Sequence, residues 1–222
     1  MCGIIGIQNN SEAAMLAYMG LYAQQHRGQE GAGIVSSDDV HLYRHMGQGL
    51  VSDVFSDPNV FDGLTGNSAI GHVRYSTTGD SDKKNVGPLT FNMGDYYLSI
   101  AHNGNLVNIE ELRFDLQKKG ALFQTSTDTE IIIHLIAREE GNNLAEKVER
   151  ALQKIEGAYS LLLLSPNEII AARDPHGIRP FCIGNLQDTV VFASETCALD
   201  LLGAEYMRDV LPGEMIIASN EG

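Results

Sequence analysis

The hydrophobic segments of this chain come in blocks, and that order restricts the folds open to it. Strands are predicted at residues 3–8, 34–36, 40–45, 69–75 and 96–102, and a dense series of short strands at 158–219. Helices are predicted at residues 12–25, 109–119, 128–140 and 144–154. Blocks of this kind favour mainly antiparallel sheets with segregated helices over a doubly wound parallel sheet. The strands outnumber what one sheet comfortably holds, so the sequence predicts an α+β fold with two packed sheets and helices outside.

Local signals mark the ends of several of these elements. Ser11 is a candidate N-cap for the first helix, and Glu130 has capping-box spacing to the threonine three residues before it. The strand that reaches His102 is predicted to stop in a sharp turn that begins at Asn103. No repeat or low-complexity linker interrupts residues 1–222, so a single domain is expected.

The charge balance and the apolar runs restrict the partners of the chain. Acidic residues outnumber basic ones by 29 to 15, which gives a formal net charge of −14. A field of this sign repels nucleic acid and anionic membranes, so neither is expected as a partner. No apolar run approaches a membrane span, and the run at residues 161–164 has the length of a buried strand. The first residues lack the basic stretch of a secretory signal, so a cytoplasmic protein is expected.

One of the three cysteines stands in an unusual place. Cys182 and Cys197 lie in apolar segments and are interpreted as small buried residues. Cys2 differs, because trimming of Met1 would leave a free α-amine on the residue that carries the thiol. An α-amine with a pKa of about 7.7–8.0 can assist a thiol of pKa about 8.5, as in an N-terminal nucleophile. The alternative is a small core residue at the start of the first strand.

A second candidate is an arginine at the end of a predicted strand. Gly71-His-Val-Arg-Tyr-Ser-Thr-Thr-Gly changes from apolar to polar, which predicts a strand that carries Arg74 to the mouth of a site. The planar guanidinium suits bidentate binding of a carboxylate, such as that of an amino-acid substrate. The alternative is a solvated surface arginine. The polar loop from Ser76 to Gly87 could close over a ligand or serve as a plain surface loop.

Two further positions offer hydrogen-bond donors and a negative charge. Asn103 and Gly104 could form an oxyanion hole, since glycine lets the backbone approach a tetrahedral centre closely. The alternative is an Asn-Gly hairpin turn, although a helix rather than a paired strand is predicted to follow. Asp128 stands at a predicted helix start, where acidic residues usually compensate the helix dipole. It could instead receive the ammonium group of a substrate.

Metal and nucleotide motifs are missing from the sequence. His41 and His45 would share a strand face, but no third ligand follows at a diagnostic spacing. Neither Gly-x-x-x-x-Gly-Lys-Ser/Thr nor Gly-x-Gly-x-x-Gly occurs. The sequence therefore predicts no metal and no nucleotide site in this chain.

Taken together, the motifs resemble a known enzyme family. The chain is similar along essentially its whole length to the N-terminal-cysteine (class II) glutamine amidotransferases, which are N-terminal-nucleophile hydrolases. The motifs are Cys2-Gly-Ile-Ile-Gly, His26-Arg-Gly-Gln-Glu-Gly-Ala-Gly, Gly71-His-Val-Arg-Tyr-Ser-Thr, His102-Asn-Gly-Asn and Ser126-Thr-Asp-Thr-Glu.

Later motifs narrow the resemblance to one branch of the family. Ala172-Arg-Asp-Pro-His-Gly-Ile-Arg-Pro and Phe192-Ala-Ser-Glu-Thr-Cys look like members that supply ammonia for phosphoribosylamine formation in purine biosynthesis. The hexosamine-forming relatives usually have Trp-Ala-Thr-His where this chain has Tyr75-Ser-Thr-Thr.

The resemblance implies a four-layer αββα fold and a set of residue roles. Cys2 would be both nucleophile and donor of the base, and the reaction would hydrolyse glutamine to glutamate and ammonia through a thioester. The remaining roles implied are an oxyanion hole at Asn103 and Gly104, the surroundings of Cys2 at Arg27 and Gly28, and glutamine binding at Arg74, Tyr75, Ser76, Thr77 and Asp128.

The resemblance also implies a partner domain. Family members of this branch carry a phosphoribosyltransferase domain, whose mark is a hydrophobic strand followed by two acidic residues and a phosphate loop. The Asp38-Asp pair falls in a predicted hairpin turn instead, so residues 1–222 are expected to be the glutaminase part alone. Mg²⁺ and any iron–sulfur cluster are expected only with the other domain, and the full-length protein is expected to be a homo-oligomer.

Other functions stay open at this point. A glutaminase domain could serve a different acceptor, and an N-terminal-nucleophile amidase could act on another small amide. The domain could also bind glutamine without hydrolysing it.

Overall fold

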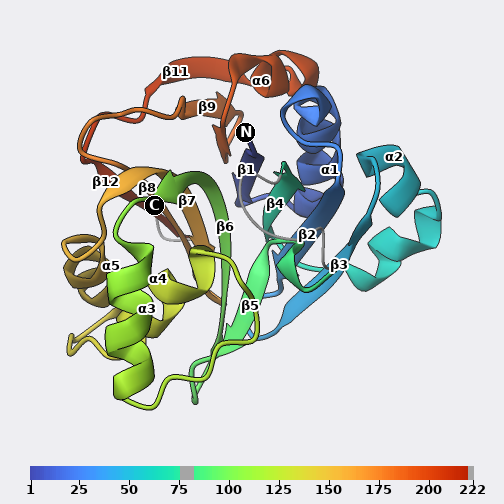
Figure 1. Ribbon diagram of the computed structural model, residues 1–222. Helices are drawn as coiled ribbons and strands as arrows, with labels where there is room; N and C mark the ends of the chain where they lie inside the picture. Colours follow the sequence, from blue (N-terminus) through green and yellow to red (C-terminus); the bar gives the residue numbers. More distant parts are fainter. Residues whose placement is uncertain (76–82, 220–222) are drawn as a thin grey trace.

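The computed structural model describes residues 1–75 and 83–219, whose strands form two sheets (Figure 1). The seven-stranded sheet has the order β11 (Glu205–Asp209), β9 (Cys182–Leu186), β10 (Thr189–Ala193), β1 (Gly3–Gln8), β4 (Ser68–Arg74), β2 (Gly31–Ser37) and β3 (Leu42–Gln48). The five-stranded sheet has the order β12 (Met215–Ser219), β8 (Glu168–Arg173), β7 (Gly157–Leu164), β6 (Tyr97–Leu106) and β5 (Leu89–Asn92). The paired strands are antiparallel in both sheets.

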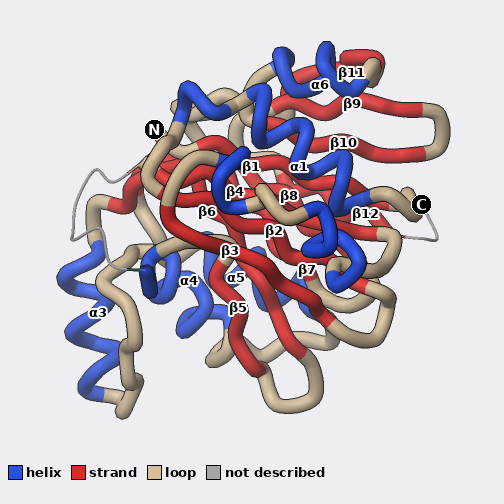
Figure 2. The backbone as a smooth tube through the Cα atoms, turned by 90° about the vertical axis from the view of Figure 1, so that its right-hand side faces the viewer, coloured by secondary structure: helices blue, strands red, loops and turns tan. Residues whose placement is uncertain are grey.

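Helices cover the outer face of each sheet, as the ribbon and the tube show from two directions (Figures 1 and 2). The seven-stranded sheet carries α1 (Ala13–Ala23), α2 (Val51–Val54) and α6 (Thr196–Leu202). The five-stranded sheet carries α3 (Ile109–Lys118), α4 (Thr129–Ile136) and α5 (Leu144–Leu152). Short 3-10 turns occupy Gln25–Arg27, Pro58–Gly63 and Lys83–Asn85. The four-layer αββα fold is therefore confirmed, but two helices differ from the prediction. α2 was not predicted, and α6 lies within residues 158–219, where only short strands were predicted. None of the described helices has the length and apolar character needed to span a membrane.

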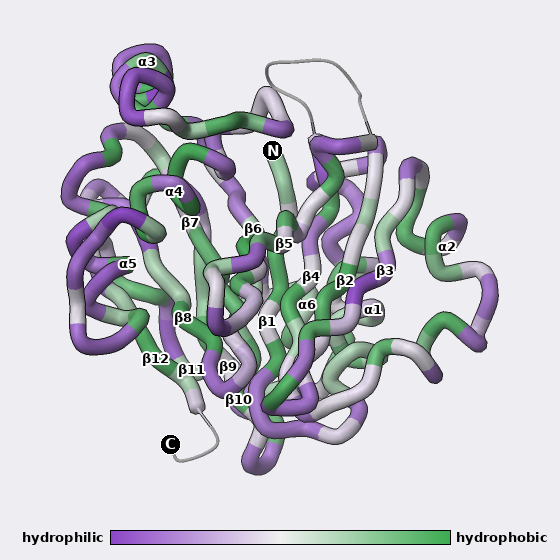
Figure 3. Tube along the Cα trace, turned by 90° about the horizontal axis from the view of Figure 1, so that it is seen from below, coloured by the Kyte–Doolittle hydropathy of each residue, from purple (hydrophilic) through white to green (hydrophobic). Residues whose placement is uncertain are grey.

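Alternating side chains of the central strands hold the layers together. In β7, Leu161 and Leu163 pack under the helices, whereas Leu162 and Leu164 pack between the two sheets. In β1, Ile5 faces α1 and Ile4 faces the other sheet. Both faces of each central strand are thus removed from water, which explains their nearly continuous apolar sequences. The hydropathy tube shows the apolar strands gathered in the middle of the molecule (Figure 3).

The ends of the helices differ from two of the predictions. Glu12, not Ser11, occupies the N-cap of α1, and it makes no side-chain capping bond. The capping box at Glu130 is also wrong, because its carboxylate accepts hydrogen bonds from the backbone N–H groups of Gln124 and Thr125. Those two donors lie in the loop before α4, so Glu130 ties that loop to the helix rather than capping it.

The turn predicted at Asn103 is wrong as well. β6 continues through Asn103 and Gly104, which lie opposite Ser160 and Tyr159 of β7. Pairing with β7 satisfies the backbone there, so the chain has no need to turn. Only glycine fits at position 104, because a Cβ there would lie 2.0 Å from the carbonyl oxygen of Ala158. The hairpin predicted at Asp38-Asp is confirmed between β2 and β3.

Candidate active site

The candidate site lies where the start of β1 meets the ends of β4 and β6. The register pairs Gly3 with Val73, so Cys2 and Arg74 are the next residues along two neighbouring strands. A cavity opens beside them and reaches across to the five-stranded sheet. Its lining includes Cys2, His72, Arg74, Tyr75, Asn85, His102, Gly104, Asn105, Ser126, Thr127 and Asp128.

Cys2 is held through its backbone, while its thiol faces the cavity. The Sγ atom lies 3.7 Å from the carbonyl oxygen of Tyr75. The Cys2 carbonyl oxygen accepts a hydrogen bond of 2.9 Å from Nε of Arg27. With its amide nitrogen turned toward the same carbonyl, Asn103 donates a second bond of 3.0 Å and accepts one of 3.3 Å from Nη2 of Arg27. Two side chains from different elements thus fix the peptide plane that follows the thiol.

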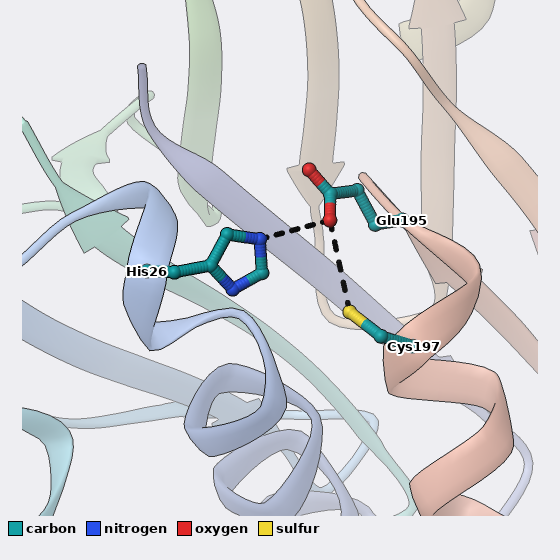
Figure 4. A group of neighbouring side chains, drawn as sticks. All are labelled: His26, Glu195 and Cys197. Carbon is teal, nitrogen blue, oxygen red and sulfur yellow. Dashed lines mark hydrogen bonds and ion pairs between the residues drawn. The ribbon is translucent and has the colours of Figure 1, made fainter.

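Arg27 is almost fully buried and has an acidic partner. Its side chain is 3% exposed, and Nη1 donates to Oε1 of Glu195. Nε2 of His26 lies 2.9 Å from the other oxygen of that carboxylate (Figure 4). Burial alone would raise the pKa of Glu195, but the adjacent Arg27 and His26 hold it below its usual value. Glu195 is therefore an ionised counterion to a buried guanidinium.

Arg74 brings a second buried cation to the cavity. Its Nη1 donates to the carbonyl oxygen of Asn85, and its Nε lies 3.8 Å from Oε2 of Glu30. The Asn85 amide in turn donates to the hydroxyl of Ser126 over 3.1 Å. The guanidinium is thus fixed at the wall of the cavity with donor capacity remaining, since Arg74 carries five N–H groups.

On the opposite wall, Asp128 and His102 form a buried ion pair. Nδ1 of His102 lies 3.3 Å from Oδ1 of Asp128, and the backbone N–H of Leu106 donates to Oδ2 over 3.1 Å. Burial alone would raise the pKa of Asp128, but His102 and the Leu106 N–H lower it. Burial alone would lower the pKa of His102, but the Asp128 carboxylate raises it. Nearby His72 is different, because burial and then Arg74 lower its pKa to about 3 and keep it neutral.

The structure brings most of the predicted site residues together. Cys2, Arg74, Tyr75, Gly104 and Asp128 line the cavity. Arg27 and Asn103 bond the carbonyl oxygen of Cys2, whereas Gly28 packs against the backbone of Arg74. Ser76 and Thr77 fall outside the described residues.

Two members of the site were not singled out from the sequence. His102 and Glu195 each stand within a longer family motif that assigns them no role of their own. A buried arginine such as Arg27 needs a counterion, but nothing in the sequence says which of the 29 acidic residues supplies it.

One group of side chains within residues 1–75 and 83–219 offers enough potential ligand atoms to bind a metal ion. The potential ligand atoms of His26, Glu195 and Cys197 lie within 4.8 Å of one another (Figure 4). Arg27 already occupies one oxygen of the Glu195 carboxylate. Burial, followed by the charge of Glu195, raises the pKa of the Cys197 thiol. The Glu195 carboxylate thus already has Arg27 and His26 as partners, and the sulfur of Cys197 is kept neutral.

Gly28 allows the segment after Arg27 to press against β4. A Cβ at this position would lie 2.6 Å from the carbonyl carbon and oxygen of Arg74. We expect Gly28→Ala to lower the free energy of unfolding by about 1–3 kcal/mol, since backbone atoms cannot move aside without shifting the strand. Urea unfolding measures this loss. Gly63→Ala is the matched control, because a Cβ there meets nothing within 4 Å; equal losses in both variants would contradict this explanation.

Comparison with known proteins places this geometry in a family. A family model described as "Glutamine amidotransferase domain" matches residues 72–201. The whole chain is 47% identical to amidophosphoribosyltransferase of Bacillus subtilis (strain 168), of which it covers 46%. It is 49% identical to the chloroplastic amidophosphoribosyltransferase 2 of Arabidopsis thaliana, of which it covers 40%. The chain thus spans less than half the length of these relatives.

Solved structures agree with the sequence comparison. The glutamine phosphoribosylpyrophosphate amidotransferase of B. subtilis, complexed with ADP and GMP, superposes with a TM-score of 0.94 at 46% identity. All of this chain and 48% of that chain are covered. The structure of an allosteric regulatory enzyme of purine biosynthesis superposes with a TM-score of 0.96 at 47% identity, again over 48% of its length.

Proposed function

This chain belongs to the glutamine amidotransferase family, and from that membership we propose that its cavity hydrolyses glutamine to glutamate and ammonia through a thioester at Cys2. The observation that carries the proposal is the meeting of three groups at one cavity. A half-buried thiol, the guanidinium of Arg74 and the ionised carboxylate of Asp128 all line it. Glutamine offers a matching amide, carboxylate and ammonium.

The two ends of the amino acid would be recognised by opposite charges. Arg74 would bind the α-carboxylate of glutamine through N–H groups that its contact with Asn85 leaves free. Asp128 would bind the α-ammonium, a role that its lowered pKa and its place in the wall support. Ser76, Thr77 and Tyr75 are proposed to complete the binding surface. This arrangement would direct the side-chain amide toward Cys2.

Chemistry would begin at the Cys2 thiol. Its sulfur attacks the amide carbon of glutamine, and the thiol proton passes through a base to the departing nitrogen, which leaves as ammonia. Water then attacks the thioester, releases glutamate and returns the proton to sulfur. The proposed base is the α-amine of Cys2, which exists once Met1 has been removed.

The oxyanion formed in each attack would be met by Asn103 and Gly104. Gly104 lines the cavity, which supports a backbone contribution from that position. Asn103 stands behind Cys2, and its amide would have to turn from the Cys2 carbonyl toward the cavity to donate. Arg27 would continue to hold that carbonyl while Asn103 turns.

The acceptor of the ammonia is proposed from the relatives. They are named amidophosphoribosyltransferases and are more than twice as long as this chain. We propose that residues 1–222 form the glutaminase domain and that a phosphoribosyltransferase domain or subunit uses the ammonia to make phosphoribosylamine. Mg²⁺ and any iron–sulfur cluster would belong to that partner, and the complete protein would be a homo-oligomer.

The test of the proposed hydrolysis is glutamate release by the chain that begins at Cys2. Glutamine should be hydrolysed and asparagine should not, because the shorter side chain cannot place its amide at the thiol while Arg74 and Asp128 hold the other end. Cys182→Ser is the matched control for Cys2→Ser, since that thiol is buried away from the cavity. Turnover of both amides at similar rates would favour a general amidase instead.

Glutamate release by this chain alone is expected not to respond to phosphoribosyl pyrophosphate. The sequence contains no glycine-rich phosphate motif, and the formal charge of −14 disfavours a polyanion. Glutaminase rates with and without the compound, together with calorimetric titration, check this. Saturable binding of phosphoribosyl pyrophosphate to residues 1–222 would contradict the proposal that only the partner domain or subunit uses this compound.

A further inference from the structure

We infer that Glu195 is a positioning residue for Cys2, acting through Arg27. This inference rests on the proposed function, because it assigns Glu195 a role in the reaction of the same thiol. Glu195 lies at the end of β10 and the start of α6, far along the chain from the cysteine. The structure joins the two by a short series of contacts between described residues.

The contacts run from the protein surface to the peptide of Cys2. His26 reaches one oxygen of the Glu195 carboxylate over 2.9 Å (Figure 4). Arg27 bonds the other oxygen. Arg27 then uses two different nitrogens, Nε toward the Cys2 carbonyl and Nη2 toward the side chain of Asn103. One guanidinium therefore links the carboxylate, the nucleophile's peptide group and a proposed oxyanion-hole residue.

The backbone holds Glu195 in register with the strand that begins beside Cys2. The N–H of Ser194 donates to the carbonyl oxygen of Ile4 over 3.1 Å. The hydroxyl of Ser194 accepts from the N–H of Ile4 over 3.0 Å. Residues 194 and 4 are thus locked together, which fixes the residues on either side of them. Glu195 directly follows Ser194, and Cys2 lies two residues before Ile4, so these bonds bring the carboxylate close to the start of β1.

Charge makes Glu195 necessary for the orientation of Arg27. The Arg27 guanidinium is only 3% exposed, so water cannot solvate its charge. Its orientation therefore depends on the carboxylate that balances the charge. Arginine forms a rigid fork, so fixing Nη1 on Glu195 also fixes the direction of Nε toward Cys2. Without the carboxylate, the guanidinium would turn toward solvent and release the Cys2 carbonyl. A nucleophile misplaced by about 1 Å can lose on the order of 10²-fold in rate.

Cys197 is the third residue of the group formed with His26 and Glu195, and its contacts distinguish a positioning role from a metal site. Its Sγ lies 3.8 Å from the Glu195 carboxylate and 3.7 Å from the carbonyl oxygen of Ala23, both long contacts. Among the described residues these are the hydrogen-bond contacts of the sulfur, and neither involves Arg27 or Cys2. A metal site would need this thiol, whereas the positioning role does not.

The experiment compares Glu195→Gln with two controls in the full chain processed to Cys2. Glutamine keeps the size and one acceptor oxygen but removes the charge. Cys197→Ser alters the same cluster without altering the link to Arg27. Glu214→Gln removes the carboxylate of another ion pair, with Arg208, away from the cavity. The kcat is expressed per Cys2 thiol that reacts with an electrophilic glutamine analogue, so that unfolded molecules are not counted.

We expect Glu195→Gln to lower kcat about tenfold or more while leaving KM for glutamine within about twofold. Both control variants should keep wild-type kcat. Arg27→Lys should lower kcat as well. The kcat of the double variant, Glu195→Gln with Arg27→Lys, should lie within about threefold of that of the slower single variant, because both substitutions break the same link between Glu195 and Cys2.

Three results would overturn the inference. A wild-type kcat in Glu195→Gln would contradict the positioning role. So would a double variant whose loss in kcat equals the product of the two single losses. A loss in Cys197→Ser as large as that in Glu195→Gln would assign the cluster to metal binding instead. If the wild-type chain released no glutamate, the proposed function would be wrong, and the positioning role of Glu195 would be wrong with it. An active wild type with an unaffected Glu195→Gln leaves the proposed function standing.

Discussion

The chain that retains Met1 is expected to release glutamate roughly 10²–10⁴-fold more slowly than the same chain beginning at Cys2. With Met1 in place, the nitrogen of Cys2 belongs to a peptide bond and has no lone pair for proton transfer. General-base assistance to the thiol is then lost. Met1 also stands beside the thiol, where glutamine must approach, and is only half exposed.

The surroundings of the N-terminus favour an unprotonated α-amine. Burial first, and then Arg27 and Arg179, lower the pKa of the α-amine on Met1, against the opposing effects of Cys2 and Glu30. An α-amine in the unprotonated form can accept a proton, as the proposed base must.

The two N-terminal forms can be separated and identified by intact mass before each is assayed for glutamate release. Alkylation of the purified Met1-retaining form provides the control, since it shows whether the thiol itself remains accessible. Equal rates from both forms would mean that the α-amine is not the base.

Arg74→Ala and Asp128→Asn are each expected to lower kcat/KM for glutamine by about 10- to 150-fold. This corresponds to the roughly 1.5–3 kcal/mol typical of a lost hydrogen bond to a charged group. Arg74 would lose the carboxylate contact, and Asp128 the ammonium contact. Asparagine at position 128 can still accept from the Leu106 N–H, so the backbone of β6 should keep its place.

Steady-state kinetics on glutamine measure the loss, and thermal unfolding reports whether the fold survives. Arg208→Ala is the control for Arg74→Ala, because it removes a partly exposed arginine whose partner is Glu214. A variant at position 74 or 128 with wild-type kcat/KM would remove that residue from the proposed binding site.

Hydrophobic patterning was enough to predict the layers but not the course of β6. The strand predicted at residues 3–8 coincides with β1, and the paired sheets with outer helices are confirmed. Asn103 and Gly104 have the local preferences of a turn, yet they continue β6 because β7 lies alongside to pair with them. Such a partner is remote in sequence, and local propensity carries no information about it.

The same limit applies to the site. Cys2 could be selected because a thiol in second place is unusual, whereas Arg74 and Asp128 are common in type and place and received their roles from the family resemblance. Glu195 could not, since its bond to Arg27 spans 168 positions and surface glutamates look identical in sequence. The ion pair of Asp128 with His102 was missed for a related reason, because Asp128 alone also fits a helix start.

The central claim is that Cys2 forms a covalent intermediate with glutamine, and acid quenching during turnover tests it most directly. The processed chain is mixed with excess glutamine, quenched in acid, and examined by intact mass and peptide mapping. We predict a γ-glutamyl adduct on the peptide that carries Cys2, present in the wild type and in Cys182→Ser and lost in Cys2→Ser together with glutamate release. Undiminished glutamate release by Cys2→Ser, or an adduct on any other residue, would contradict the mechanism.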